Sequence, residues 1–225
     1  GQWAEQLEPP PAGCSFVNFI ASHDGIGLRP LEGLVPASDI QRLTDAAHER
    51  GGFAAMRSAD DGTETVYELN IALFSAFGGT AKNIPAYLGA HQLMLAFQGI
   101  PALYLNAFVG GLNDLQGVES TGRTRSINRG HWQLDDLKTI LATETNEQSI
   151  IFAELNRSLE IRGSQSAFAP SAQQEILAYT KDSLWLKREN TDQVILVIAS
   201  FSEAPIETEL PRQDAACESL SLIHI

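Results

Sequence analysis

Short apolar runs alternate with helical patterns through the first two thirds of the chain. Residues 15–21 form a nearly continuous apolar run, which is typical of a strand buried on both faces. Residues 84–97 are apolar on most faces, with Pro85 in the first turn, and predict a buried helix that Gly99 ends. Residues 102–105 predict a second buried strand. This order is that of a βαβ unit, so we expect the two strands to be parallel.

The segment between the first strand and the buried helix carries weaker patterns. Ser38 followed by Gln41 resembles a capping box and predicts a helix that ends at Gly51. Residues 62–67 predict a loop, and residues 68–77 predict a short helix.

The next segment begins with a stretch rich in Gly, Asn, Asp and Arg. Residues 110–129 therefore predict a long loop. Apolar spacing then predicts helices over 134–141 and 146–162, the second ending at Gly163.

The pattern changes after Pro170 to short strand-like runs separated by turn residues. We expect strands over 175–180, 184–188, 194–201 and 206–210. They predict a small antiparallel β domain at 170–225, following an α/β domain at 1–165.

Composition narrows the range of partners. The 225 residues include 15 Lys and Arg against 28 Asp and Glu, a net charge of −13. This acidic balance argues against a nucleic-acid partner, which requires a cationic surface. No apolar run approaches the ~20 residues that span a bilayer, so we expect no membrane partner.

The cysteines and the chain ends add little. Cys14 and Cys217 lie far apart, which argues against a disulfide framework or a metal site and favours a reducing compartment. The chain opens at Gly1 without a Met, and we expect both ends to be truncations, with residues 219–225 not native.

Candidate chemistry begins at His23 and Asp24, which follow the first apolar run. Barrel enzymes place reactive groups just past the carboxyl ends of their strands. A carboxylate beside an imidazole can bind sugar hydroxyls and stabilise an oxocarbenium-like transition state. On the dipeptide alone, the alternative is a turn in which Asp24 is a cap and His23 a loop residue.

The surrounding residues carry a family resemblance. Residues 18–30 (NFIASHDGIGLRP) resemble the fourth signature region of glycoside hydrolase family 13, the α-amylase superfamily, in its sucrose phosphorylase-like branch. Residues 65–70 (TVYELN) resemble the acceptor-side loop of that branch, and residues 121–129 (TGRTRSINR) its motif after barrel strand eight. Residues 99–104 (GIPALY) resemble the entry into that strand. The resemblance implies the C-terminal part of a (β/α)8 TIM barrel, with strands seven and eight.

The same resemblance implies roles for single residues. Asp24 matches the carboxylate that stabilises the transition state, and His23 matches the histidine that holds the donor glucose. Arg125 matches an arginine that clamps the far side of that glucose. Tyr67 and Glu68 match a mobile loop beside phosphate and acceptor. Glu at position 68 favours glucosides of glycerate, glycerol or fructose 6-phosphate over sucrose.

The resemblance also implies what is missing. A retaining enzyme needs a nucleophile and an acid/base carboxyl about 5 Å apart. Both family positions would precede Gly1, so we expect this chain alone to be inactive. Glu32 and Asp114 lie near the motifs, but we expect loop or supporting roles for them.

Other polar and aromatic residues have simpler interpretations. We expect His91 to be a core histidine with a satisfied hydrogen bond, and Trp132 and Trp185 to be core or domain-interface residues. The arginines at 121–129 suggest local salt bridges, and Arg123 remains a candidate for phosphate contact. The spacing of His, Cys, Asp and Glu predicts no metal site.

The resemblance therefore implies a retaining α-glucoside phosphorylase. It would transfer glucose from sucrose or a related glucoside to inorganic phosphate, a co-substrate, without a cofactor and in the cytoplasm. Two alternatives remain: a hydrolase or transglucosidase of the same superfamily, and a non-catalytic scaffold protein. The sequence does not indicate an oligomeric state.

Overall fold

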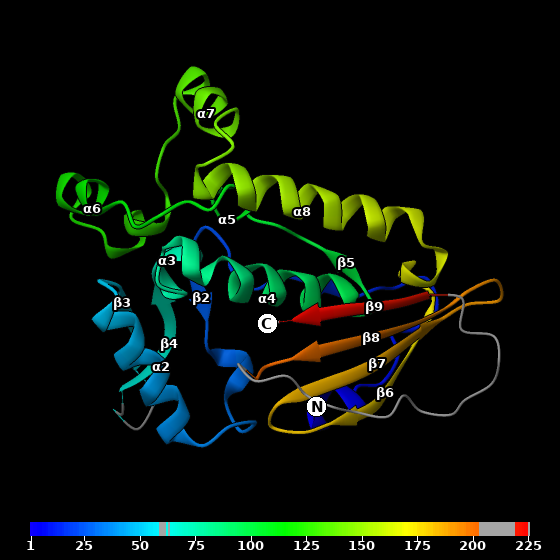
Figure 1. Cartoon of the computed structure of the whole chain (residues 1–225). Helices are drawn as coiled ribbons and strands as arrows, with labels where there is room; N and C mark the ends of the chain where they lie inside the picture. The colour runs from blue at the N-terminus through cyan, green and yellow to red at the C-terminus, as the bar shows by residue number, and fades with distance from the viewer. Residues whose placement is uncertain (59–61, 63, 203–218, 225) are drawn as a thin grey trace. The chain divides into compact units, whose positions relative to one another are not determined.

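The computed structural model (Figure 1) describes residues 1–58, 62, 64–202 and 219–224, the last range as backbone only. Its contacts divide the chain into two compact units. The first unit contains residues 1–19, 85–102 and the described residues from 154 onward. The second contains residues 103–153 and the described residues of 20–84. Each unit is thus built from segments that are separate in the sequence.

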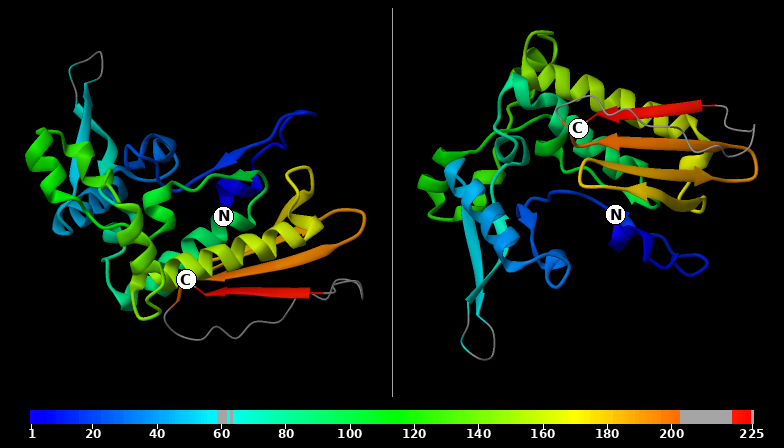
Figure 2. Two further views of the ribbon diagram at one scale, coloured as in Figure 1. Left: turned by 90° about the horizontal axis from the view of Figure 1, so that it is seen from above. Right: turned by 60° about the horizontal axis from the view of Figure 1, so that its bottom comes forward.

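A four-stranded sheet dominates the first unit. Its strands lie in the order β6 (Gln173–Tyr179), β7 (Ser183–Glu189), β8 (Val194–Ser200) and β9 (Ser219–His224). Three of the expected strand runs correspond to β6, β7 and β8, which pair antiparallel. The expected strand at 206–210 lies outside the described residues. β9 runs parallel to β8, which differs from an all-antiparallel sheet, and Figure 2 shows it at the edge beside β8.

The long apolar helix α4 (Ile84–Ala96) confirms the prediction at 84–97. Its last turn packs against the sheet, where Ala96 lies in one buried cluster with Leu186, Ile195 and Val197. Pro85 is the only residue of this helix that is exposed, which agrees with a helix that is apolar on most faces.

A buried arginine ties the end of α4 to the sheet. Arg188 of β7 is fully buried and donates hydrogen bonds to the carbonyls of Ala96 and Ala169 at 2.9 Å. It also donates to the carbonyls of Gln173 and Ala172, at 3.3 and 3.4 Å. Burial lowers the pKa of Arg188 to about 10, so the guanidinium stays charged at neutral pH. These acceptors include carbonyls that the end of a helix leaves without a partner.

Two short strands of the first unit, β1 (Val17–Asn18) and β5 (Ile100–Pro101), pair in parallel and confirm the predicted βαβ orientation. The second strand lies just before the predicted 102–105. The expectation that the first strand is buried on both faces is wrong for the described residues. Val17 is 61% exposed and Ile100 49%, because each strand has only the other as a described partner.

The core histidine predicted in α4 is confirmed. His91 is 2% exposed and its Nδ1 lies 2.9 Å from the carbonyl oxygen of Tyr87, one turn earlier. Burial lowers the pKa of His91, so the ring is neutral in the folded protein. This is the structural role that the sequence predicts for His91.

The second unit contains an antiparallel sheet in the order β2 (Ile26–Gly27), β4 (Glu64–Asn70) and β3 (Phe53–Ser58). Helix α2 (Ala37–Glu49) packs on it through a core that includes Ala47, Leu69 and Ile71. The predicted loop at 62–67 is therefore wrong from residue 64 on. The predicted helix at 68–77 shrinks to α3 (Leu73–Ala76), because residues 68–70 belong to the strand.

Helix α2 was predicted in the right place with the wrong start. It begins at Ala37 after Pro36, and no side chain caps it. Ser38 lies inside the helix, and Gln41 donates to Asp45 instead of completing a capping box.

The predicted loop at 110–129 contains helix α6 (Leu115–Thr121) and the 3₁₀ helix η3 (Thr124–Asn128), preceded by α5 (Leu105–Phe108). The helices predicted at 134–141 and 146–162 are confirmed as α7 (Leu134–Leu141) and α8 (Glu147–Ser164). The remaining short elements are α1 (Gln2–Glu5), η1 (Arg29–Leu31), η2 (Ala81–Asn83) and η4 (Ser166–Phe168). Within the described residues, no helix combines the length and apolar character needed to cross a membrane.

Candidate active site

A tight turn after β1 presents the His-Asp pair. Ser22 and Gly25 exchange backbone hydrogen bonds of 3.0 and 3.1 Å, which place His23 and Asp24 at the tip. Gly25 has φ +128°, and a Cβ there would lie 2.1 Å from the carbonyl oxygen of Leu69. Only glycine allows this close approach to β4. The turn is therefore anchored directly on the strand that carries the other site residues.

Strand β4 supplies three polar side chains, Tyr67, Glu68 and Asn70. Neighbouring residues of a regular strand point to opposite faces. Here the pairing with β3 jumps between Ala55 and Met56, so that Glu68 and Val66 have partners in the register and Tyr67 does not. This bulge lets Tyr67 and Glu68 approach the same arginine, as bulges redirect side chains elsewhere.

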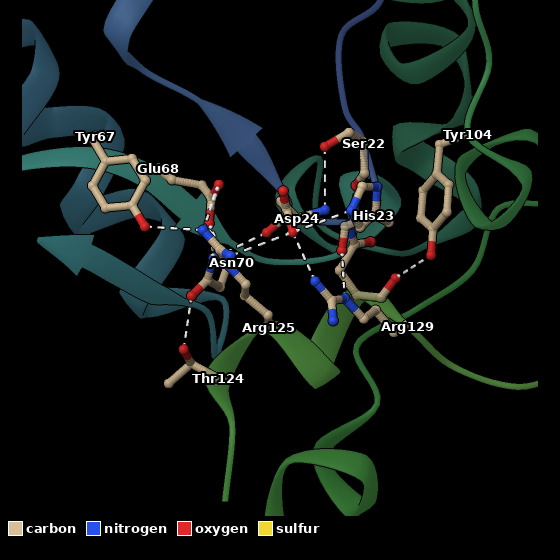
Figure 3. A network of polar contacts seen from close by, with 11 residues as sticks. Ser22, His23, Asp24, Tyr67, Glu68, Asn70, Tyr104, Thr124, Arg125 and Arg129 are labelled. Carbon is tan, nitrogen blue, oxygen red and sulfur yellow. Dashed lines mark hydrogen bonds and ion pairs between the residues drawn. The ribbon is translucent and has the colours of Figure 1, made fainter. Parts of the chain in front are cut away.

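That arginine, Arg125, comes from η3 (Figure 3). Its Nε donates to Glu68 Oε1 at 3.0 Å, and its Nη2 donates to the Tyr67 hydroxyl at 2.9 Å. A second contact joins Nη2 to Glu68 Oε2 at 3.4 Å. The hydrogen bond to Glu68 is the main cause that raises the pKa of Arg125 above its ordinary value. Arg125 is thus charged throughout the neutral range.

Asn70 and Thr124 complete the link between β4 and η3. Thr124 Oγ1 donates to Asn70 Oδ1 at 2.8 Å, and Asn70 Nδ2 donates to Glu68 Oε1 at 2.7 Å. The same amide donates to the backbone carbonyl of Asp24 at 3.0 Å. Asn70 is fully buried, so its hydrogen bonds fix the turn, the strand and η3 together.

Two arginines and a histidine approach Asp24. Arg129 Nη2 lies 2.7 Å from Asp24 Oδ1, His23 Nε2 3.4 Å and Arg125 Nη1 3.6 Å (Figure 3). The side chain of Asp24 remains 32% exposed and that of His23 66%. Two carboxylates and two guanidiniums thus form a compensated cluster with an accessible edge.

A polar scaffold lies behind η3. Tyr104 donates its hydroxyl to the carbonyl of Asn128 at 2.9 Å, and Asn106 Nδ2 donates to that carbonyl at 3.3 Å. Trp132 Nε1 donates to Asn106 Oδ1 at 2.8 Å. Burial raises the pKa of Tyr104, which keeps its hydroxyl a donor. Trp132 has a supporting role here, and Trp185 is a buried residue of β7, as expected of core aromatics.

The structure brings the five residues predicted from the resemblance into one cluster, namely His23, Asp24, Tyr67, Glu68 and Arg125. It places Arg129, one of the arginines for which the sequence suggested salt bridges, against Asp24. It also adds residues that the sequence did not single out, Asn70, Asn106, Thr124 and Asn128. Their only signal was that most of them lie inside or beside the matched motifs.

The remaining candidates have other positions. Glu32 lies 3.5 Å from Arg57, and Asp114 accepts a hydrogen bond of 2.7 Å from the backbone of Gly117 as the cap of α6. Both have the supporting roles that we expected. Arg123 is exposed, and its side chain makes no hydrogen bond or ion pair with any described residue.

Comparisons with known proteins find relatives among glycoside phosphorylases. Glucosylglycerate phosphorylase from Escherichia coli strain K12 is 32% identical over 84% of this chain and 35% of its own length. Glucosylglycerate phosphorylase from Spirochaeta thermophila is 31% identical, covering 92% of this chain and 36% of its own. Sucrose phosphorylase from Bifidobacterium adolescentis is 26% identical over 68% of this chain. The chain spans about a third of the length of these relatives. No family model matches the chain.

A solved structure confirms the fold class. Sucrose 6F-phosphate phosphorylase from Thermoanaerobacter thermosaccharolyticum superposes with a TM-score of 0.70 and 23% identity, covering 82% of this chain and 36% of that one. The predicted fold, the C-terminal part of a (β/α)8 barrel followed by a small β domain, is therefore confirmed. The chain corresponds to a C-terminal part of these proteins, about a third of their length. With the sequence relatives, this identifies it as a member of the sucrose phosphorylase-like branch of glycoside hydrolase family 13.

Proposed function

We propose that this chain is part of an α-glucoside phosphorylase, which transfers a glucosyl group to inorganic phosphate and releases α-glucose 1-phosphate. The observation that supports it is the cluster of Asp24 with Arg125 and Glu68, in a chain homologous to phosphorylases. We call the protein that carries this chain together with the rest of the family's length the full-length protein.

Asp24 has the chemistry needed to stabilise the transition state. Cleavage of a glycosidic bond develops positive charge on the ring, and hydrogen bonds to the sugar hydroxyls strengthen as it forms. A fixed carboxylate stabilises that charge without having to reorganise. His23, 66% exposed beside it, is able to bind a glucosyl hydroxyl.

Arg125 and Tyr67 are proposed to border the same glucosyl group. The guanidinium of Arg125 is held by Glu68 and Tyr67, so it is a preorganised donor for hydroxyl oxygens. By holding the glucosyl group in a fixed orientation, these residues would increase the reaction rate.

The reaction with retention also needs a nucleophile and an acid/base carboxyl, about 5 Å apart. Asp24 and Glu68 are both bound to arginines, and neither is assigned these roles. We propose that the two carboxyls come from the part of the full-length protein outside this chain. On that basis this chain alone is inactive.

Glucosylglycerate is the proposed donor. Relatives named for it are 31–32% identical, against 25–27% for those named for sucrose. Arg123, which is exposed and has no described partner, is a candidate to bind phosphate or the glycerate carboxylate. We also propose that residues 1–165 belong to the catalytic barrel and 170–225 to the β domain. The cytoplasmic location stays a prediction.

The test is a product analysis on the full-length protein. With glucosylglycerate or sucrose as donor, we expect glucose 1-phosphate to form at a rate that depends on phosphate. Glucose release that is independent of phosphate would indicate a hydrolase. Absence of any glucosyl transfer would favour a scaffold.

A further inference from the structure

The contacts of Asp24 are one-sided. The ion pairs of Asp24 with Arg129, Arg125 and His23 all have their recorded contact at Oδ1 (Figure 3). Oδ1 accepts a hydrogen bond from Arg129, whereas Oδ2 accepts none from a described residue. A carboxylate can rotate about its terminal torsion at little cost, so something must select which oxygen stays free.

We infer that Arg129 is the positioning residue that fixes the carboxylate of Asp24, with Oδ1 bound and Oδ2 left for the glucosyl group. The inference rests on the proposed function, since it assigns Asp24 to the transition state. Arg129 is not itself expected to contact the sugar.

Distance distinguishes the contact of Arg129 with Asp24 from the contacts of Arg125 and His23. Arg129 Nη2 lies 2.7 Å from Oδ1 in a hydrogen bond, whereas Arg125 Nη1 lies at 3.6 Å. Arg125 is also engaged by Glu68 at 3.0 Å. His23 Nε2 lies at 3.4 Å on a side chain that is mostly exposed. Arg129 therefore makes the shortest contact with the carboxylate of Asp24.

Arg129 binds the backbone of the turn as well as the carboxylate. Its Nε donates to the carbonyl of His23 at 3.0 Å, while Nη2 holds Asp24. One planar guanidinium thus fixes both the peptide and the side chain of the turn. Lysine has a single nitrogen and cannot reproduce this two-point geometry.

The base of Arg129 is itself held in place. Asn128, only 3% exposed, donates its Nδ2 to the carbonyl of Ser22 at 2.5 Å. The carbonyl of Asn128 accepts from Tyr104 at 2.9 Å. The guanidinium therefore starts from a rigid segment, as a positioning group requires.

The experiment uses the full-length protein and α-glucosyl fluoride as donor. Fluoride leaves without protonation by an acid. Fluoride release therefore reports on cleavage of the bond to the glucosyl group, whether phosphate or water then accepts that group. The variants are Arg129→Ala, Arg129→Lys and the control Arg42→Ala. Arg42 is an 81% exposed arginine of α2, 3.7 Å from Asp39.

For Arg129→Ala we expect kcat for fluoride release to fall about 100-fold, with KM changed less than about threefold. Added guanidinium should restore about tenfold, because it can refill the site beside Oδ1. Arg129→Lys should retain an intermediate rate, since it reaches the carboxylate but not the carbonyl as well. Arg42→Ala should match the unsubstituted protein.

Two outcomes would overturn the inference. One is a kcat for Arg129→Ala within about threefold of that of the control. The other is a fall in kcat for Arg129→Ala that added guanidinium does not reverse, with two conditions met. The thermal unfolding midpoint of Arg129→Ala equals that of the unsubstituted protein, and Arg129→Lys retains the unsubstituted rate. Failure of the proposed function is seen separately: fluoride release by the unsubstituted protein would yield glucose but no glucose 1-phosphate when phosphate is added.

Discussion

Replacing Glu68 by Gln tests what this buried carboxylate does. Its Oε1 accepts from Arg125 Nε at 3.0 Å and from Asn70 Nδ2 at 2.7 Å, and its Oε2 lies 3.4 Å from Arg125 Nη2. With both oxygens occupied, Glu68 holds Arg125 and has little capacity to bind an acceptor. The alternative from the family resemblance is that position 68 selects the acceptor.

The expected size follows from these contacts. Glutamine preserves the oxygen but turns an NH₂ group toward Nη2, a donor against a donor, and removes the charge. A charge-assisted hydrogen bond contributes about 1.5–3 kcal/mol. Because the side chain of Arg125 is 39% exposed, water compensates part of this loss. We expect about 1.4 kcal/mol, or about a tenfold loss in kcat/KM for fluoride release from α-glucosyl fluoride.

The assay measures two quantities on the full-length protein. The first is kcat/KM for fluoride release, and the second is the partition of the glucosyl group between phosphate and added glycerate. Glu68→Gln should lower the first and leave the second unchanged. The control is Glu64→Gln, which removes the same charge from an exposed position of β4. A changed partition with unchanged fluoride release would refute the positioning role of Glu68.

Two further predictions concern stability, measured by denaturant unfolding. Burial lowers the pKa of His91. At mildly acidic pH the unfolded chain therefore binds a proton on this histidine that the folded chain does not bind. The free energy of unfolding should fall by up to about 1.4 kcal/mol per pH unit as the pH drops below about 6.5. His91→Gln should remove this dependence, while the exposed His48→Gln should keep it; equal slopes would contradict the assignment. Arg188→Met should cost about 3–5 kcal/mol because it removes the donor of four carbonyls, two of which, those of Ala96 and Ala172, belong to buried residues. The control is Arg157→Met, since the side chain of Arg157 is 71% exposed. An equal loss of unfolding free energy in the two variants would refute the role of Arg188.

The sequence predicted the regular, strongly patterned elements well. α4 was found because it is apolar on most faces, and α7 and α8 because apolar residues recur at helical spacing. The parallel pairing of β1 and β5 followed from the order strand, helix, strand. These features depend on local patterns and on general rules of chain connection.

The hairpin of β3 and β4 was missed for a physical reason. A strand is recognised by its period of two, and the bulge at Tyr67 breaks that period within β4. Polar residues such as Glu64 and Thr65 then resemble a loop, and Glu68 to Asn70 were joined to the following short helix. Tertiary pairing decided the conformation of this segment.

The candidate site shows a similar division. Motif resemblance was sufficient to group Asp24 with Arg125. It could not identify Arg129, whose contact with Asp24 joins residues far apart in the chain. Nor could it show that the carboxylate of Glu68 is already occupied by Arg125, because spacing along a strand does not reveal how a bulge turns its side chains.

The most direct test of the account compares Asp24→Asn with Asp39→Asn in the full-length protein. The quantity measured is kcat for phosphate-dependent formation of α-glucose 1-phosphate. Asparagine preserves the shape of Asp24 but removes the charge, so we expect a loss of about 1000-fold. Asp39, a partly exposed residue of α2, should be replaceable without effect on kcat. A near-normal kcat for Asp24→Asn would contradict the central claim that the cluster around Asp24 is part of a phosphorylase active site.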